Sequence, residues 1–171
     1  MLLDDFCGLL PQAVPQLEKG CFLTAGGDEP NPMTIGWAQF GVVWGKPMAL
    51  VLVRKSRYTY GLMEKAQTFT VSVPREGAMK AELAYCGSHS GRDGDKFAAA
   101  GLTRAAARFG GADGVANCLA RVECRIVQRV DMPLERLDPA MRAKYYKETP
   151  ALPDGDPHVL YFGEVLGVAQ D

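Results

Sequence analysis

The sequence predicts a mainly β fold, a closed or nearly closed antiparallel barrel of about six strands with a few short helices. Two observations lead to this prediction. The chain contains about six short segments rich in Val, Ile and aromatic residues, and Pro and Gly separate them. Short antiparallel strands at such spacing commonly close into barrels, which removes exposed sheet edges. The length of 171 residues suits one domain, so residues 1–171 are expected to form a single unit.

Turn residues bound the expected strands. The Gly- and Pro-rich cluster 26–32 ends the first strand, and the connection Gly45-Lys46-Pro47 joins the second strand to the third. Pro74 ends the fourth strand, because proline cannot donate to a ladder. The expected strands are 20–25, 33–44, 48–54, 68–73, 117–130 and 158–168.

The last two strands carry different patterns. In 117–130 the residues alternate, which predicts one buried and one solvated face. Both faces of 158–168 are apolar, so this strand is expected to be covered on both sides, with a second subunit as one candidate cover. The apolar face of 117–130 holds Cys118, Ala120, Val122, Cys124 and Ile126, and its polar face holds Arg121, Glu123 and Arg125.

Four short helices are expected between the strands. Ser56 is the expected N-cap of the first, over 56–66. Met79, Leu83 and Cys86 follow helical spacing in the second, over 76–86, which ends before Gly87. The remaining two are 95–100 and 139–147.

Composition excludes several functional classes. The formal net charge is -1 and the sequence pI is about 6.1, whereas nucleic-acid binders usually show a basic excess. Five cysteines without regular spacing, and an acidic start at Asp4 and Asp5, indicate a reduced cytoplasmic protein without disulfides. The longest apolar region, 33–53, is interrupted by polar residues and Pro47, so no membrane-spanning helix is expected.

Common catalytic and cofactor motifs do not fit. The sequence has no GxGxxG, and the run 41–46 has three residues between its glycines where a P-loop has four. His89 and His158 are the two histidines, and neither belongs to a metal-ligand motif, so no metal is expected.

Three segments carry features of a cofactor site. Segment 54–59 places basic residues and hydroxyls where a strand meets a helix start, which suits a phosphate. The glycine- and serine-rich loop 86–97 can turn backbone amides toward a ligand. In 31–37, Gly36 would let a planar group approach the backbone. For 54–59 and 86–97 taken alone, the favoured interpretation is an ordinary structural role, an N-capping serine and a mobile connection; for 31–37 a strand with a glycine bulge fits equally well.

Together these segments resemble the flavin reductase-like family of FMN-binding split barrels, in particular its flavoredoxin-type branch. The matching pieces appear in family order and span about 20–168: they are 31–37, 45–47, 54–59, 90–92, 95–97 and 163–165. The resemblance implies a six-stranded antiparallel Greek-key split barrel and a homodimer with FMN near the subunit interface. The stretch 104–114 matches nothing in the family pattern.

The resemblance also implies site residues. The backbone of 34–37 would line the isoalloxazine ring, and the phosphate would be held from 55–59 and 90–92. The expected cofactor-binding residues are Thr34, Ile35, Gly36, Trp37, Lys55, Ser56, Arg57, Thr59, Ser90, Gly91, Arg92, Lys96 and Phe97.

Three functional hypotheses follow. The first is an NAD(P)H-dependent reductase of flavin or ferric iron, or one that passes electrons to a partner. The second is an FMN-binding electron carrier without nicotinamide turnover, and the third is a cofactor-free barrel module. Because a flavin carries the redox chemistry itself, no catalytic side chain is assigned. His89 and His158 are the groups that can titrate near neutral pH.

Overall fold

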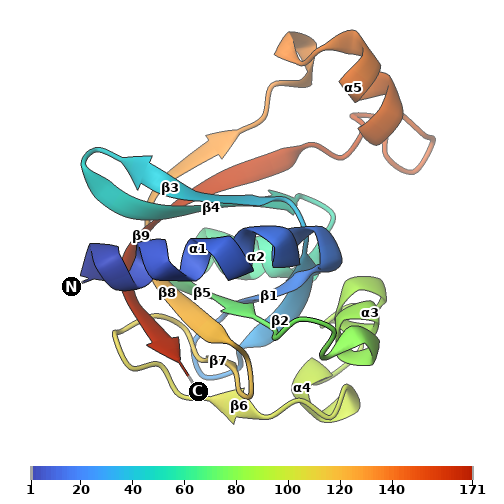
Figure 1. Ribbon diagram of the computed structural model, residues 1–171. Coiled ribbons are helices and arrows are strands. Elements are labelled where there is room, and N and C mark those ends of the chain that lie inside the picture. The colour runs from blue at the N-terminus through green and yellow to red at the C-terminus, as the bar shows by residue number, and fades with distance from the viewer. Residues whose placement is uncertain (1, 171) are drawn as a thin grey trace.

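The computed structural model describes residues 2–170, and it is mainly β (Figure 1). Within this range one seven-stranded antiparallel sheet, in the order β2-β1-β5-β8-β9-β4-β3, curls around the core, and β6 and β7 form a separate pair. The strands are β1 (Cys21–Ala25), β2 (Asn31–Ile35), β3 (Ala38–Val43), β4 (Lys46–Arg54), β5 (Thr68–Val73), β6 (Arg104–Ala105), β7 (Gly114–Val115), β8 (Ala120–Asp131) and β9 (His158–Gln170).

The expected count of six strands is wrong, because the segment 33–44 forms two strands. β2 and β3 lie at opposite edges of the sheet, and Gly36 and Trp37 carry the chain between them. The backbone carbonyl of Trp37 accepts a hydrogen bond from Leu52 N of β4 at 3.3 Å. Because apolar residues continue through most of 33–44, the sequence does not show that the strand ends between β2 and β3. The other five expected strands are present with shifted ends.

Helix α1 (Leu2–Lys19) was not expected from the sequence. It packs across the barrel (Figure 1), and Phe6, Leu9, Ala13 and Leu17 are buried in the main core at helical spacing. Pro11 and Pro15 lie inside the helix, and prolines at such positions normally argue against one. The apolar face facing the core outweighs that local cost.

The other helices are close to the expected segments. They are α2 (Tyr58–Lys65), α3 (Lys80–Ser88), α4 (Lys96–Ala99), the 3-10 turn η1 (Leu134–Arg136) and α5 (Pro139–Tyr145). Two expectations about them are wrong. Ser56 does not cap α2, since Arg57 occupies the N-cap position and makes no side-chain capping bond. The helix expected to end before Gly87 continues through Gly87 to Ser88. Asp95 and Asp138 do cap α4 and α5 through their carboxylates.

The polar face of β8 is solvated only in part, contrary to the alternation pattern. Arg125 is exposed as expected, but Arg121 and Glu123 are only 2% and 1% exposed. The segment 104–115, with β6 and β7, lies over this face. Glu123 accepts hydrogen bonds from the backbone N–H groups of Arg108 (2.7 Å), Phe109 (2.7 Å) and Gly111 (3.0 Å). This carboxylate therefore anchors the segment that hides it.

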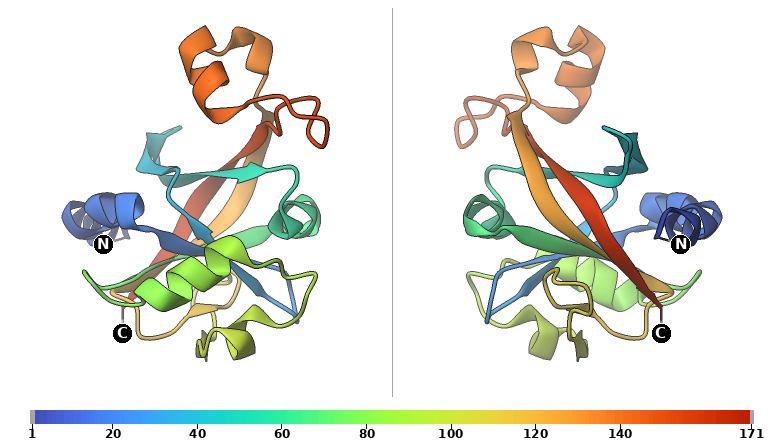
Figure 2. Two further views of the ribbon diagram at one scale, coloured as in Figure 1. Left: turned by 90° about the vertical axis from the view of Figure 1, so that its right-hand side faces the viewer. Right: turned by 90° about the vertical axis from the view of Figure 1, so that its left-hand side faces the viewer.

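A lobe formed by residues 132–157 stands clear of the barrel (Figures 1 and 2). It contains η1 and α5 and connects β8 to β9. Along β9 one face is buried, with Val159, Tyr161 and Val165, while the alternate residues are only half-buried. No helix within residues 2–170 is long and apolar enough to span a membrane.

Candidate functional site

Two adjoining cavities lie where β2, β4, β9 and the start of α2 meet, and Met33 and Arg57 line both of them. The first, of about 180 Å³, is lined by Met33, Thr34, Ile35, Gly36, Trp37, Leu52, Arg54, Arg57 and His158. The second, of about 130 Å³, is lined by Asn31, Met33, Ser56, Arg57, Tyr58, Thr59, Cys86, Ser88, His89, Ser90, Gly91, Arg92 and Lys96.

The chain leaving β2 forms one wall of the first cavity. Gly36 packs closely on the end of α1, because a Cβ there would lie 3.1 Å from the Leu17 carbonyl oxygen. Trp37 follows and is 41% exposed, although its ring contacts Tyr145 of the lobe at 5.1 Å and His158 at 5.2 Å between centroids. The segment from Thr34 to Trp37 therefore lines the cavity with an aromatic ring at its end, which suits a flat ligand.

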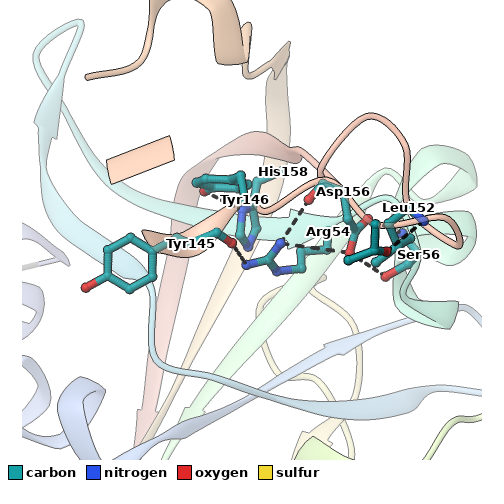
Figure 3. A network of polar contacts seen from close by, with 8 residues as sticks. Arg54, Ser56, Tyr145, Tyr146, Leu152, Asp156 and His158 are labelled. Carbon is teal, nitrogen blue, oxygen red and sulfur yellow. Dashed lines mark hydrogen bonds and ion pairs between the residues drawn. The ribbon is translucent and has the colours of Figure 1, made fainter. Parts of the chain in front are cut away.

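Arg54, at the end of β4, ties the lobe to the barrel beside this cavity (Figure 3). Its guanidinium donates to the backbone carbonyls of Asp156 (3.0 Å) and Tyr145 (2.9 Å). It also lies 4.9 Å from the centre of the Tyr146 ring. These contacts fix a positive charge in the cavity wall.

His158 opens β9 in the same wall and is 5% exposed. Its Nδ1 lies 2.7 Å from the Tyr146 hydroxyl. Burial, together with the charge of Arg54, lowers the pKa of His158 to about 4. The imidazole is therefore neutral at pH 7 and can act as a hydrogen-bonding group without adding charge.

The second cavity is bordered by the first turn of α2 and the loop 88–92, and cations lie on both sides. Arg57 donates to the Gly87 carbonyl at 3.4 Å, and Arg92 donates to the Ser56 carbonyl at 3.4 Å. Both side chains are exposed and line the cavity, and both of these hydrogen bonds are long. The first N–H groups of a helix have no intrahelical acceptor, so this cavity has the donors and charge that an anion needs.

Buried polar contacts hold the shape of the second cavity. Lys96 is 4% exposed, and its ammonium donates to the carbonyls of Cys86 (2.8 Å) and His89 (3.2 Å). Burial lowers the pKa of Lys96. The Thr59 hydroxyl accepts from Asn31 Nδ2 at 2.9 Å. A Cβ at Gly91 would collide with Asn31 Oδ1 and the Tyr58 ring, so the loop can run this close only with glycine.

The structure brings most of the predicted site residues together. Lys55 is an exception: it lines neither cavity and pairs with Asp131. Phe97 is the other, since it is buried in the small core under α3 and α4. The first cavity gathers Thr34, Ile35, Gly36, Trp37 and Arg57, and the second gathers Ser56, Arg57, Thr59, Ser90, Gly91, Arg92 and Lys96.

Ser56 lines the second cavity, but its polar groups already form hydrogen bonds with Asp156. Its hydroxyl donates to Asp156 Oδ2 at 2.7 Å, and its backbone N–H donates to Asp156 Oδ1 at 3.0 Å (Figure 3). Sequence reasoning assigned no cofactor role to Arg54 or His158. The position of Arg54 at the start of the basic segment 54–59 was a usable signal, whereas the approach of Asp156 was not visible in the sequence.

One family model matches most of the chain. Residues 19–171 match the family model described as "Flavin reductase like domain". An uncharacterized protein of Archaeoglobus fulgidus is 28% identical over 146 residues, which cover 85% of this chain and 68% of that protein.

Solved structures share the fold at low identity. Flavoredoxin of Methanosarcina acetivorans superposes with a TM-score of 0.67 at 24% identity, covering 89% of this chain and 68% of that one. An NADH:FAD oxidoreductase of Streptomyces globisporus superposes with a TM-score of 0.65 at 24% identity, covering 89% of this chain and 74% of that one. An FMN-binding protein of Thermus thermophilus superposes with a TM-score of 0.66 at 22% identity, covering 89% of this chain and 71% of that one.

Proposed function

The chain belongs to the flavin reductase-like family, and from that premise we propose that it is a single-domain oxidoreductase that binds FMN along the two cavities. NADH or NADPH is the proposed electron donor. The observation that carries this proposal is the adjacency of the cavities: the segment from Thr34 to Trp37, with its aromatic ring, lines the first, while arginines and a helix start line the second. A flavin mononucleotide presents the same two chemistries in the same order, a flat ring and then a phosphate.

The second cavity fits a phosphate through charge and donors. Arg57 and Arg92 supply the positive charge, and the Ser90 hydroxyl and the first turn of α2 supply donors. In this proposal Ser56 does not donate to the phosphate, because its hydroxyl proton goes to Asp156. Ser56 and Asp156 instead hold the turn that presents Arg57.

The first cavity fits the flavin ring. The backbone from Thr34 to Trp37 would lie along it, and the positive charge of Arg54 and the neutral His158 line the same cavity beside the Trp37 ring. When bound, a flavin supplies hydride acceptance, so the protein has to supply position and polarity. Arg54 and His158 provide that polarity from fixed positions.

A homodimer forms part of the proposal. The tip of the β3–β4 hairpin exposes Val42 (60%) and Trp44 (66%), and the Trp44 ring lies 6.0 Å from Phe162 of β9 between centroids. An apolar surface of this kind on a folded domain commonly marks a protein interface. We propose that a second copy of the chain covers it.

Anaerobic reduction distinguishes the reductase from an electron carrier. The protein loaded with FMN is mixed with NADH or with NADPH under nitrogen, and the flavin absorbance is followed. Bleaching by one donor, at a rate compatible with turnover, is the expected result. If neither donor bleaches bound FMN while dithionite does, nicotinamide turnover is refuted and the electron-carrier function takes its place.

A further inference from the structure

A separate cavity of about 430 Å³ lies between the end of α1, the edge strand β2 and the helix α3, which runs beside β2 (Figure 1). We call it the α1–α3 cavity. It adjoins the proposed flavin site without belonging to it, because it shares only Thr34 with the first cavity and only Ser88 with the second. Its volume lies in the range of about 300 to 1,000 Å³ that is typical of sites for small organic ligands.

The uncharged polar side chains of this lining already form hydrogen bonds with the protein. The Thr34 hydroxyl donates to the Leu83 carbonyl at 2.6 Å, and the Ser88 hydroxyl donates to the Ala84 carbonyl at 2.8 Å. Gln16 donates its amide to a backbone carbonyl at 3.1 Å. A ligand therefore meets a mainly apolar wall with few donors left to offer. The lining residues without a polar side chain are Gly77, Ala78, Leu83, Ala84 and Gly87.

Two lysines supply the charge of the α1–α3 cavity. Lys19 pairs with Glu76 at 2.9 Å between Nζ and Oε1, so its charge is largely compensated. Lys80, the first residue of α3, is exposed, and it forms no ion pair with any of residues 2–170. Its positive charge is therefore available to a ligand. A single uncompensated ammonium suits a monoanion such as a carboxylate better than a doubly charged phosphate.

We propose that the α1–α3 cavity binds a small carboxylate with an apolar body, the body packing on Leu83 and Ala84 and the carboxylate pairing with Lys80. This is a ligand site in addition to the flavin site, and it does not rest on flavin binding. A sugar or a nucleotide fits the lining poorly, because the Thr34 and Ser88 hydroxyls already donate to the protein and buried ligand hydroxyls would be left unpaired. The apolar wall instead favours a hydrocarbon body.

Two variants test the apolar wall and the charge separately. Ala84 is exposed on α3 and lines the α1–α3 cavity but neither flavin cavity, so Ala84→Trp would fill the proposed site alone. Its control is Ala81→Trp, an exposed position of the same helix that lines none of the three cavities. Lys80→Gln removes the charge. Its control is Lys65→Gln, at an exposed lysine of α2 that also lines none of the three.

The experiment titrates 2-naphthoate and its uncharged analogue 2-naphthamide into the full chain by calorimetry. Excess FMN is present, so that the flat probes do not enter the proposed flavin cavities. The wild type is expected to bind the carboxylate about three-fold or more tightly than the amide, the size of effect that a partly exposed ion pair gives. Lys80→Gln should remove this preference, and Ala84→Trp should weaken both probes at least ten-fold. Both control variants should match the wild type.

Three results would overturn the proposed carboxylate site: no binding of 2-naphthoate by the wild type, equal affinities for the two probes, or unchanged affinities in Ala84→Trp. Titration of FMN into the same proteins tests the flavin proposal separately. A chain that fails to bind FMN would refute the proposed function, while the effects of Ala84→Trp and Lys80→Gln on naphthoate affinity would still decide the carboxylate site.

Discussion

His158 lies close to the positive charge of Arg54. It is buried, it is close enough to Arg54 for the guanidinium to disfavour a second positive charge, and it is hydrogen-bonded to Tyr146. Its pKa of about 4 is therefore well below the ordinary value of 6.5. His158 therefore adds no charge to that of Arg54 and Arg57 in the wall of the first cavity at physiological pH.

This environment predicts a pH-dependent stability. Because the folded-state pKa is depressed, the unfolded chain takes up a proton below about pH 6.5 that the folded chain refuses until about pH 4. The contribution of neutral His158 to the free energy of unfolding is complete above about pH 6.5 and is lost as the pH falls from there toward about 4. The stability difference between the wild type and His158→Gln should shrink by about 2 kcal/mol between pH 7 and pH 5. Urea unfolding at both pH values measures it, and a constant difference would show that His158 is not buried as a neutral group.

The sequence predicted Arg57, Ser90 and Arg92 as site residues through the family resemblance, since the local features of their segments also suit ordinary structural roles. The structure places these three residues around one cavity. The individual direction of each side chain was not predictable. Lys55 points to Asp131, and Ser56 donates to Asp156, a residue 100 positions away. Such long-range partners leave no local trace in the sequence.

At the scale of elements, the pattern of apolar and polar residues predicted where the strands lie better than it predicted which segments cover their faces. The alternation in β8 assigned the correct residues to each face, but it could not show that 104–115 would fold over the polar one. The sequence pattern of alternating charged residues is the same whether water or backbone N–H groups form hydrogen bonds with them. Helix α1 was missed for a related reason, since Pro11 and Pro15 obscure a helix that tertiary packing stabilises.

Glu123 provides a test of the cover over β8. Glu123→Gln removes the charge that accepts three backbone N–H bonds and turns part of the side chain into a donor facing donors. The expected loss is about 2 kcal/mol of unfolding free energy. Chemical denaturation with an unchanged m-value measures the loss. Glu18→Gln, at an exposed position of α1, is the control and should lie within about 0.5 kcal/mol of the wild type. Equal effects at both positions would refute the anchoring role.

At the scale of the whole molecule, the proposed flavin site and the proposed dimer interface involve different elements. The first and second cavities follow β2, α2 and the loop 88–92, while the exposed apolar tip of the β3–β4 hairpin contacts β9. The proposed homodimer would cover that tip, and obligate interfaces commonly bury about 2,000 Å² or more.

The dimer prediction compares two exposed valines. Val42→Asp places a charge in the proposed interface and should raise the dimer dissociation constant at least ten-fold. Val14→Asp introduces the same change on α1, where Val14 is 51% exposed, and should have no such effect. Sedimentation velocity at micromolar concentration, with flavin present, measures both. A wild-type protein that sediments as an 18.5 kDa monomer would contradict the homodimer.

The central claim is that the second cavity binds the phosphate of a flavin, and comparing FMN with riboflavin tests it most directly. The two ligands share the ring and differ by the phosphate. Calorimetric titration should show FMN bound more tightly, and Arg57→Ala should weaken FMN about ten-fold or more, since a charge-assisted hydrogen bond contributes about 1.5 to 3 kcal/mol. Riboflavin affinity should barely change. Arg108→Ala, an arginine of the segment over β8 that lines neither cavity, is the control and should leave both affinities unchanged. Equal losses of FMN and riboflavin in Arg57→Ala would contradict the assignment of the phosphate to this cavity.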